Sequence, residues 1–145
     1  MQPPPEAGAA VTDGQLAAMG IEELLKAGSP TRIDAGAGAV AHLGRWAREL
    51  GGERLFLVTD TGLREAGHEE RVLAFLDESG FDSSCVAVFG DVTPNPTTND
   101  VDRALEVARE HESDLIIGLG GGSSMDCAKG VNFLLTNGGQ MRDYQ

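Results

Sequence analysis

The sequence is poor in cysteine, in positive charge and in long apolar runs, and each shortage argues against a class of protein. Its two cysteines, Cys85 and Cys127, form no CxxC pair, which argues against a disulfide framework and favours the reducing cytoplasm. The 11 lysines and arginines face 23 aspartates and glutamates, a formal net charge of −12. Such a chain repels nucleic acid and anionic membrane surfaces. No apolar stretch approaches the roughly 20 residues that cross a bilayer.

The N-terminal segment also lacks the features of a targeting peptide. It has no lysine or arginine before Lys26, unlike a secretory n-region or an arginine-rich transit peptide. Residues 1–29 are interpreted as a tail, disordered over residues 1–14. The remainder has room for one short amphipathic helix, whose apolar side would be Leu16, Ile21, Leu24 and Leu25.

What is present from about residue 30 onward is an alternation of two patterns. Short runs rich in Val, Ile, Leu and Phe are typical of buried strands, and they occupy residues 55–58, 85–89 and 114–120. Segments with a helical period precede and separate them, at residues 40–50, 69–79 and 98–111. The alternation predicts the α/β class, a Rossmann-like parallel sheet with flanking helices, in a domain spanning residues 30–145. The inward side of the first helix is expected to be Val40, Leu43, Trp46, Ala47 and Leu50.

The most informative stretch is DLIIGLGGGSSMDCAKG, at residues 114–130. A predicted strand runs into Gly120, Gly121 and Gly122, and a helix is expected to begin at Ser123. Glycines let a backbone approach a ligand closely, and a helix start offers free N–H groups and a positive dipole end. Ser123 and Asp126 are predicted to form a capping box. The pattern favours a phosphate-binding loop, and the alternative is a tight turn with a good helix cap.

Two other phosphate motifs fit less well. The Walker A pattern fails because Lys129 is followed by Gly130 rather than by Ser or Thr. A dinucleotide-binding start could also be placed at Gly36-x-Gly38-x-x-Ala41, with Asp60 at a suitable distance. The preceding residues, TRIDA, are weak strand formers, so this second placement is the lesser alternative.

The segment GGGSSMDCAK resembles the GGGSxxDxAK motif of the iron-containing alcohol dehydrogenases. Three further motifs follow the order of that family: DAGAGAV, the strand LFLVTDTGL, and the Pro-Asn-Pro turn of DVTPNPTTNDV. The resemblance covers residues 31–145. Within the wider superfamily, glycerol dehydrogenases tend to carry Lys, and dehydroquinate synthases Val, at the position of Ser123, so the serine favours the alcohol dehydrogenase branch.

The resemblance implies a set of residues that bind NAD. Asp60 would accept hydrogen bonds from the adenosine ribose and disfavour the 2′-phosphate of NADP. Asn95 would contact the adenine side. The nearest basic residue, Arg64, is expected on the solvent side of the next helix. The pyrophosphate and adjoining ribose would be held by Gly121, Gly122, Ser123, Ser124, Met125 and Asp126.

Three of these residues have simpler interpretations. Asp60 could serve only as a helix N-cap, and Asn95 only as a turn-forming residue. Asp126 could pair with Lys129, which matches the lysine of the motif, as an i, i+3 ion pair on the helix surface.

The reaction centre is expected to lie elsewhere. The family uses a divalent iron held by one Asp and three His of a helical C-terminal domain, and this chain stops at MRDYQ. Its three histidines, His42, His68 and His111, are predicted to be solvated surface residues. The chain is therefore expected to lack metal ligands and catalytic residues and to be inactive alone.

For the full-length protein, the resemblance implies hydride transfer between NAD and a small primary alcohol or aldehyde, in a homo-oligomer. The alternatives are a polyol or glycerol dehydrogenase of the same superfamily, and a stand-alone nucleotide-binding module without catalysis.

Overall fold

The computed structural model describes residues 31–144, so the expectations for residues 1–29 lie outside the described part. The chain divides into two compact units, Met1–Ala39 and Val40–Gln145. In the described part of the first unit, residues 31–35 form no strand. The alternative dinucleotide-binding start at Gly36 therefore lacks the strand that such a motif requires.

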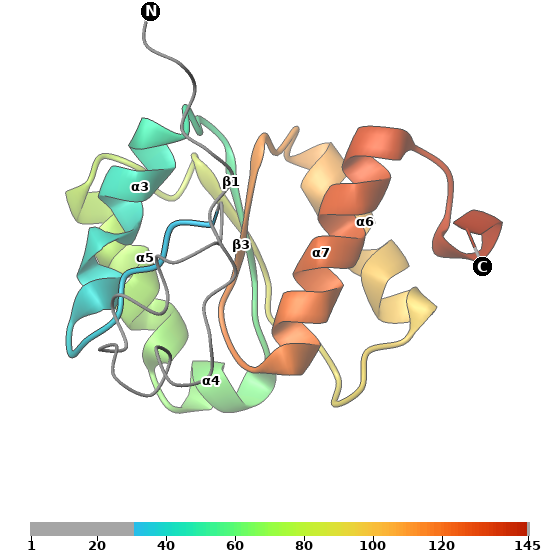
Figure 1. The fold of residues 1–145 in the computed structure, drawn as a ribbon, viewed down its shortest axis with the longest axis horizontal. Coiled ribbons are helices and arrows are strands. Elements are labelled where there is room, and N and C mark those ends of the chain that lie inside the picture. Colours follow the sequence, from blue (N-terminus) through green and yellow to red (C-terminus); the bar gives the residue numbers. More distant parts are fainter. Residues whose placement is uncertain (1–30, 145) are drawn as a thin grey trace, which may run out of the picture. The chain divides into compact units, whose positions relative to one another are not determined.

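The second unit alternates helices and parallel strands, as the sequence predicted (Figure 1). The 3₁₀ helix η1 (Ala39–His42) leads from the first unit into α3. The elements that follow are α3 (Leu43–Glu49), β1 (Leu55–Val58), α4 (Thr61–Glu65), α5 (His68–Glu78), β2 (Val86–Phe89), α6 (Thr98–Glu110), β3 (Leu115–Gly118), α7 (Gly122–Asn137) and η2 (Met141–Tyr144).

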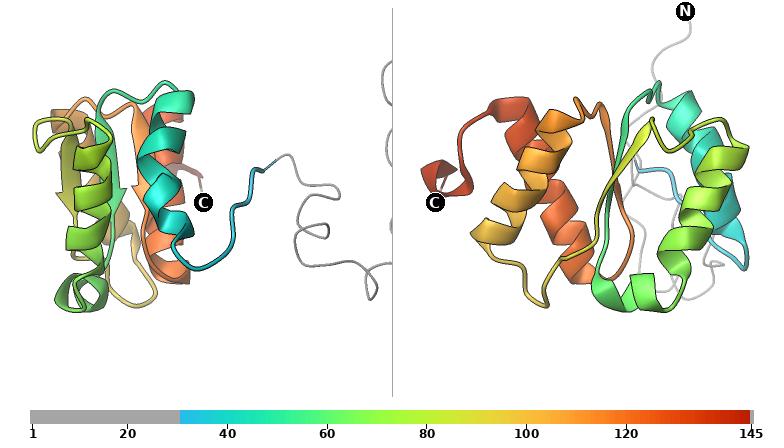
Figure 2. Two further views of the ribbon diagram at one scale, coloured as in Figure 1. Left: turned by 90° about the vertical axis from the view of Figure 1, so that its left-hand side faces the viewer. Right: turned by 180° about the vertical axis from the view of Figure 1, so that it is seen from behind.

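The three strands form one parallel sheet in the order β2-β1-β3. Leu55 of β1 is level with Val86 of β2 on one side and with Leu115 of β3 on the other. Helices α3 and α5 lie on one face of the sheet, and α6 and α7 lie on the other (Figures 1 and 2). The predicted α/β class and parallel sheet are confirmed, with the strand ends within a few residues of those expected.

Alternate residues of the central strand supply two hydrophobic cores. Phe56 and Val58, both fully buried, pack with α6 and α7, whereas Leu55 and Leu57 pack with the α3 and α5 face. Successive side chains of a strand point to opposite faces of the sheet. A four-residue apolar run can therefore be buried along its whole length only when helices cover both faces. The buried side of α6 is the one expected from its period: Val101, Ala104, Leu105 and Ala108.

The first predicted helix is shorter than its hydrophobic pattern suggested. The α-helix ends at Glu49, and Leu50, expected on the inward side, is 77% exposed. Gly51 follows with φ +78°, the left-handed conformation that commonly ends a helix. None of the helices formed by residues 31–144 is long and apolar enough to cross a membrane.

Candidate functional site

Three loops meet at the carboxyl edge of the sheet because all three strands run in the same direction. The loop after β1 begins with Thr59 and Asp60, and the loop after β3 carries Gly120 and Gly121. The loop after β2 runs from Gly90 to Thr97. In open α/β sheets, ligands bind at this edge, where loops from neighbouring strands converge.

A cavity of about 590 Å³ opens between these three loops, within the size range of cofactor pockets. Its wall comprises Asp60, Thr61 and Gly62, then Asp91, Val92, Thr93 and Pro94, then Gly121, Gly122 and Ser123. The segments are far apart in sequence, and four of the predicted cofactor-binding residues line this one space: Asp60, Gly121, Gly122 and Ser123.

Asp60 holds the loop after β1 in place with both carboxylate oxygens. Oδ1 accepts a hydrogen bond from the backbone N–H of Leu63 at 3.0 Å, which makes Asp60 the N-cap of α4. Oδ2 accepts from the hydroxyl of Ser124 at 3.2 Å. Each carboxylate oxygen can accept two hydrogen bonds, so the cap leaves acceptor capacity at the cavity wall.

The glycine segment after β3, Gly120 to Gly122, requires glycine at its first position because of the backbone conformation and close contacts there. The space beside the other two glycines is unobstructed. Gly120 has φ +145°, and a Cβ atom there would lie 2.6 Å from Ser124 Oγ and 3.1 Å from Asp60 Oδ2. A Cβ atom at Gly121 or Gly122 would meet nothing within 4 Å. The backbone of these two residues is therefore accessible from the cavity.

The start of α7 differs from the predicted capping box. The helix begins at Gly122 with Gly121 as N-cap, and no side chain caps it. Ser123 is already the second helical residue, and Asp126 pairs with Lys129 at 3.4 Å instead. The helical hydrogen bonding begins with the bond from the Met125 N–H to the Gly121 carbonyl, so the N–H groups of Gly122, Ser123 and Ser124 have no intrahelical partners.

Asn95 of the Pro-Asn-Pro turn and Ser123 of the glycine-rich motif are in contact, although the two motifs are separate in the sequence. The backbone N–H of Asn95 donates to Ser123 Oγ at 3.2 Å. Asn95 also has φ +55°, a conformation that asparagine tolerates better than most residues. The structure thus gives Asn95 the turn-forming role and places it beside the glycine segment.

The remaining predicted residues point to different places. Ser124 is fully buried and contacts Asp60 rather than the cavity. Met125 lines a groove beside β3 and α7, and Asp126 is exposed in its ion pair with Lys129. None of these three side chains is part of the cavity wall between the loops.

Comparison with known proteins places this geometry in a family. Residues 30–145 match the model of the iron-containing alcohol dehydrogenases. The chain belongs to the iron-containing alcohol dehydrogenase family. It is 36% identical over 110 residues to alcohol dehydrogenase 4 of Schizosaccharomyces pombe, covering 76% of this chain and 25% of that protein. It is 40% identical over 111 residues to the 1,3-propanediol dehydrogenase of Citrobacter freundii, covering 75% of this chain and 28% of that protein.

A solved structure of the same family superimposes closely. The sulfoacetaldehyde reductase of Bifidobacterium kashiwanohense, in complex with NAD⁺, matches with a TM-score of 0.71 and 26% identity. The match covers 81% of this chain and 30% of that one. The chain spans about a quarter to a third of the length of the relatives it matches.

The residues 31–144 of this family member do not form a metal centre. They contain no group of three or more His, Cys, Asp or Glu side chains that could hold an ion, so the described residues do not fit the iron for which the family is named. His42 and His68 are exposed, as expected. His111 is not, because its Nε2 lies 3.2 Å from the Cys85 carbonyl oxygen and its Nδ1 lies 3.4 Å from Arg54 Nη2.

A buried carboxylate shapes the loop after β2. Asp100 is 4% exposed and accepts hydrogen bonds from the Thr97 N–H at 2.8 Å, the Thr97 hydroxyl at 3.0 Å and the Thr93 hydroxyl at 2.9 Å. The bond from the Thr97 backbone is the main cause that lowers the pKa of Asp100 below its usual value. Asp100 thereby fixes the stretch that carries Pro94 and Asn95.

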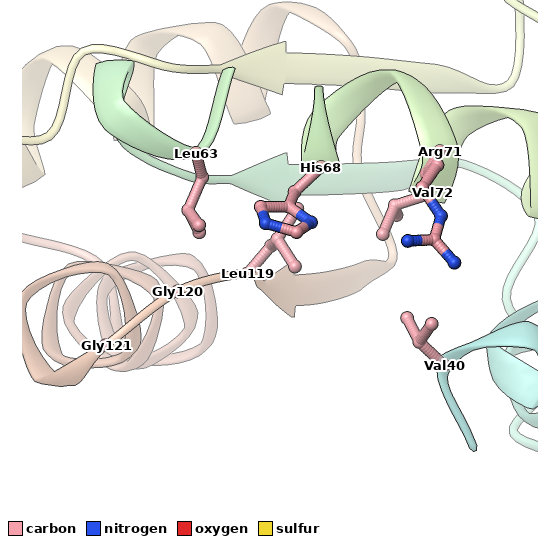
Figure 3. Close-up of a pocket in the computed structure, with 8 residues that line it drawn as sticks. All are labelled: Val40, Leu63, His68, Arg71, Val72, Leu119, Gly120 and Gly121. Carbon is pink, nitrogen blue, oxygen red and sulfur yellow. The ribbon is translucent and has the colours of Figure 1, made fainter. Parts of the chain in front are cut away.

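A second pocket, of about 370 Å³, lies beside the glycine segment (Figure 3). Helix α5 contributes His68, Arg71 and Val72, and the loop after β3 contributes Leu119, Gly120 and Gly121. Val40 and Leu63 complete its mostly apolar lining. Gly121 lines both pockets, so the glycine segment lies between them.

Sequence reasoning did not identify Asp91 at the cavity or the ion pairs of Arg64 beside it. Asp91 lines the cavity, and its position directly after a strand and one glycine was the signal that could have identified it. Arg64 was expected on the solvent side of α4. It is exposed there, and its guanidinium group also lies against Gly90 and pairs with Glu69 at 3.0 Å and Asp91 at 3.6 Å.

Proposed function

We propose that this chain binds the adenosine diphosphate half of NAD in the cavity at the carboxyl edge of its sheet. In this arrangement, Gly121, Gly122 and Ser123 face the pyrophosphate, and Asp60 accepts hydrogen bonds from the adenosine ribose. Asn95 orders the neighbouring turn. The relative solved with NAD⁺ supports the choice of cofactor.

The observation that carries the proposal is that free backbone N–H donors lie beside glycines whose backbone a ligand can approach. Three backbone N–H groups at the start of α7 have no helical partner, and the two glycines beside them present no side chain. Such a site attracts a phosphate through local dipoles. This local attraction is needed because the whole chain carries a formal charge of −12.

We further propose that the site serves an NAD-dependent alcohol dehydrogenase. The substrate alcohol would give a hydride to the nicotinamide ring of NAD⁺ and a proton to solvent, leaving an aldehyde. The alcohol dehydrogenases among its relatives support this reaction class. Iron, when bound by residues outside the described part, would supply the Lewis acid that stabilises the alkoxide. Residues 31–144 would position the cofactor only.

Isothermal titration calorimetry of the 145-residue chain tests the binding proposal. We expect NAD⁺ and ADP to bind in competition with one another. Nicotinamide mononucleotide, which lacks the adenosine half, should leave both affinities unchanged. Absence of NAD⁺ and ADP binding in a chain that unfolds cooperatively in urea would refute the proposal, as would competition by nicotinamide mononucleotide alone.

A further inference from the structure

The loop after β2 places one carboxylate between two arginines at the cavity wall. Asp91 Oδ1 lies 3.6 Å from Arg64 Nη1, and Asp91 Oδ2 lies 3.8 Å from Arg103 Nη2. Each arginine also has a second acidic partner. Arg64 Nε lies 3.0 Å from Glu69, and Arg103 Nη1 lies 4.0 Å from Asp100. Asp91 is the member of this network that lines the cavity with Asp60.

Packing holds both guanidinium groups near this end of β2. Gly90 is buried, and a Cβ atom there would overlap the guanidinium of Arg64, so the glycine gives Arg64 its place. The guanidinium of Arg103 lies over the ring of Phe89, 5.4 Å from its centre. The positions of both arginines therefore depend on contacts other than Asp91.

An arginine near the adenosine ribose is the usual means by which dinucleotide-binding folds accept the 2′-phosphate of NADP. Here two arginines lie next to the cavity, and α4, which carries Arg64, begins one residue after Asp60. Asp91 pairs with both of them, and its carboxylate adds negative charge to the wall. A 2′-phosphate would meet this carboxylate in addition to Asp60.

We infer that Asp91 is a second determinant of cofactor choice, because it occupies both arginines and so keeps them from accepting a 2′-phosphate. This inference rests on the proposed binding of NAD. Replacing Asp91 with a neutral residue would leave each arginine with one acidic partner and one free side. The cavity wall would then carry one negative charge fewer beside the two arginines.

The network contributes little to folding, so its variants can be studied. The side chains of Arg64, Asp91 and Arg103 are 45%, 60% and 56% exposed, and exposed ion pairs stabilise proteins only weakly. Asp91→Asn removes the charge and keeps the shape of the side chain. Asp91→Ser removes the same charge and leaves a smaller side chain. Glu110 is the last residue of α6, at the end of the helix that is far from the loop after β2. Glu110→Gln is therefore a control that removes one negative charge at a position distant from the cavity.

The experiment measures the ratio of the NADP⁺ and NAD⁺ dissociation constants by calorimetry on the 145-residue chain. For Asp91→Asn and Asp91→Ser, we expect the preference for NAD⁺ to fall about tenfold, as for one like charge removed at short range. For Glu110→Gln, we expect less than about a twofold change, because solvent screens distant surface charges. The triple variant Asp91→Asn, Arg64→Gln, Arg103→Gln should lose the gain in NADP⁺ affinity.

Three results would overturn the inference while leaving NAD⁺ binding intact. They are an unchanged ratio in both Asp91 variants, an equal change in Glu110→Gln, and a gain that persists in the triple variant. If the wild-type chain binds neither dinucleotide, the proposed function fails and this inference fails with it.

Discussion

Ser124 donates a hydrogen bond from its hydroxyl to Asp60 Oδ2 across 3.2 Å, although 64 residues separate the two. The bond ties the loop after β1 to the first turn of α7, and it is buried at the Ser124 end. The first turn of α7 also contacts the loop after β2, through the hydrogen bond from the Asn95 N–H to Ser123 Oγ. The carboxylate at the cavity wall is therefore held by the helical turn that follows the glycine segment.

Gly122→Val is expected to abolish NAD⁺ binding while preserving the fold. The position is the first residue of α7, and a Cβ atom there meets nothing within 4 Å, so the branched side chain projects into the space proposed for the pyrophosphate. Valine has a higher helix propensity than glycine, so the substitution carries no propensity cost. Thr136→Val, near the other end of the same helix, should leave NAD⁺ affinity unchanged. Unaltered NAD⁺ affinity in Gly122→Val would show that the pyrophosphate does not bind at this segment.

Gly120→Ala and Gly121→Ala form a matched pair with opposite expected outcomes. At Gly120 the φ of +145° and the 2.6 Å approach to Ser124 Oγ strain any side chain, so we expect a loss of about 1–3 kcal/mol in the free energy of unfolding. At Gly121 the φ is −82° and a Cβ atom is unobstructed, so the loss should stay within about 0.5 kcal/mol. Urea unfolding followed by circular dichroism measures both, and equal losses would contradict this account.

Asp60→Ser is expected to narrow the preference for NAD⁺ over NADP⁺. The wild-type chain should favour NAD⁺ by at least about tenfold, because a like charge about 4 Å from a phosphate costs up to roughly 4 kcal/mol before screening. Serine is itself a good N-cap for α4, so the substitution removes the charge without removing the cap. Calorimetry with both dinucleotides gives the ratio. A wild-type chain that prefers NADP⁺, or a ratio that Asp60→Ser does not move, would reduce Asp60 to a helix cap.

Asp100→Asn is expected to destabilise the chain at neutral pH and to matter little in acid. The folded-state pKa of Asp100 is lowered from 3.8, chiefly by the Thr97 N–H. A lowered pKa gives stability that is fully present above 3.8 and is lost as the pH falls through the folded-state value. Replacing the hydrogen-bonded carboxylate should cost about 1–3 kcal/mol at pH 7. Urea unfolding of both proteins across pH 7 to 2 should show the difference shrink below pH 4, and a constant difference would exclude the linkage.

The 145-residue chain is expected to show no dehydrogenase activity, even with added ferrous iron or zinc. Its residues 31–144 contain no group of side chains that could hold the metal. The assay follows NADH absorbance with ethanol, propanol or propanediol as the substrate. Metal-dependent NADH formation above a blank without protein would show that the chain contains a reaction centre of its own.

The sequence by itself determined the α/β class and the approximate positions of the three strands found in residues 31–144. Short apolar runs such as LFLV at 55–58 can be buried on both faces only in a sheet covered by helices on both sides. It also determined that a glycine segment follows β3, because Gly120 needs a backbone conformation that other residues resist. Asp60 was identifiable as the polar residue at the end of a buried strand.

The tertiary structure alone decided which side chains share the cavity and where each points. The contact between Asn95 and Ser123, and the direction of Arg64 toward Asp91, follow from the order of strands and from the small volume of Gly90. The start of α7 at Gly122 rather than Ser123 has a similar cause, since the Ser123 hydroxyl accepts a bond from a distant loop instead of capping its own helix. Local patterns fix the elements because propensity and burial act over a few residues. Partners separated by tens of residues are set only when the chain packs.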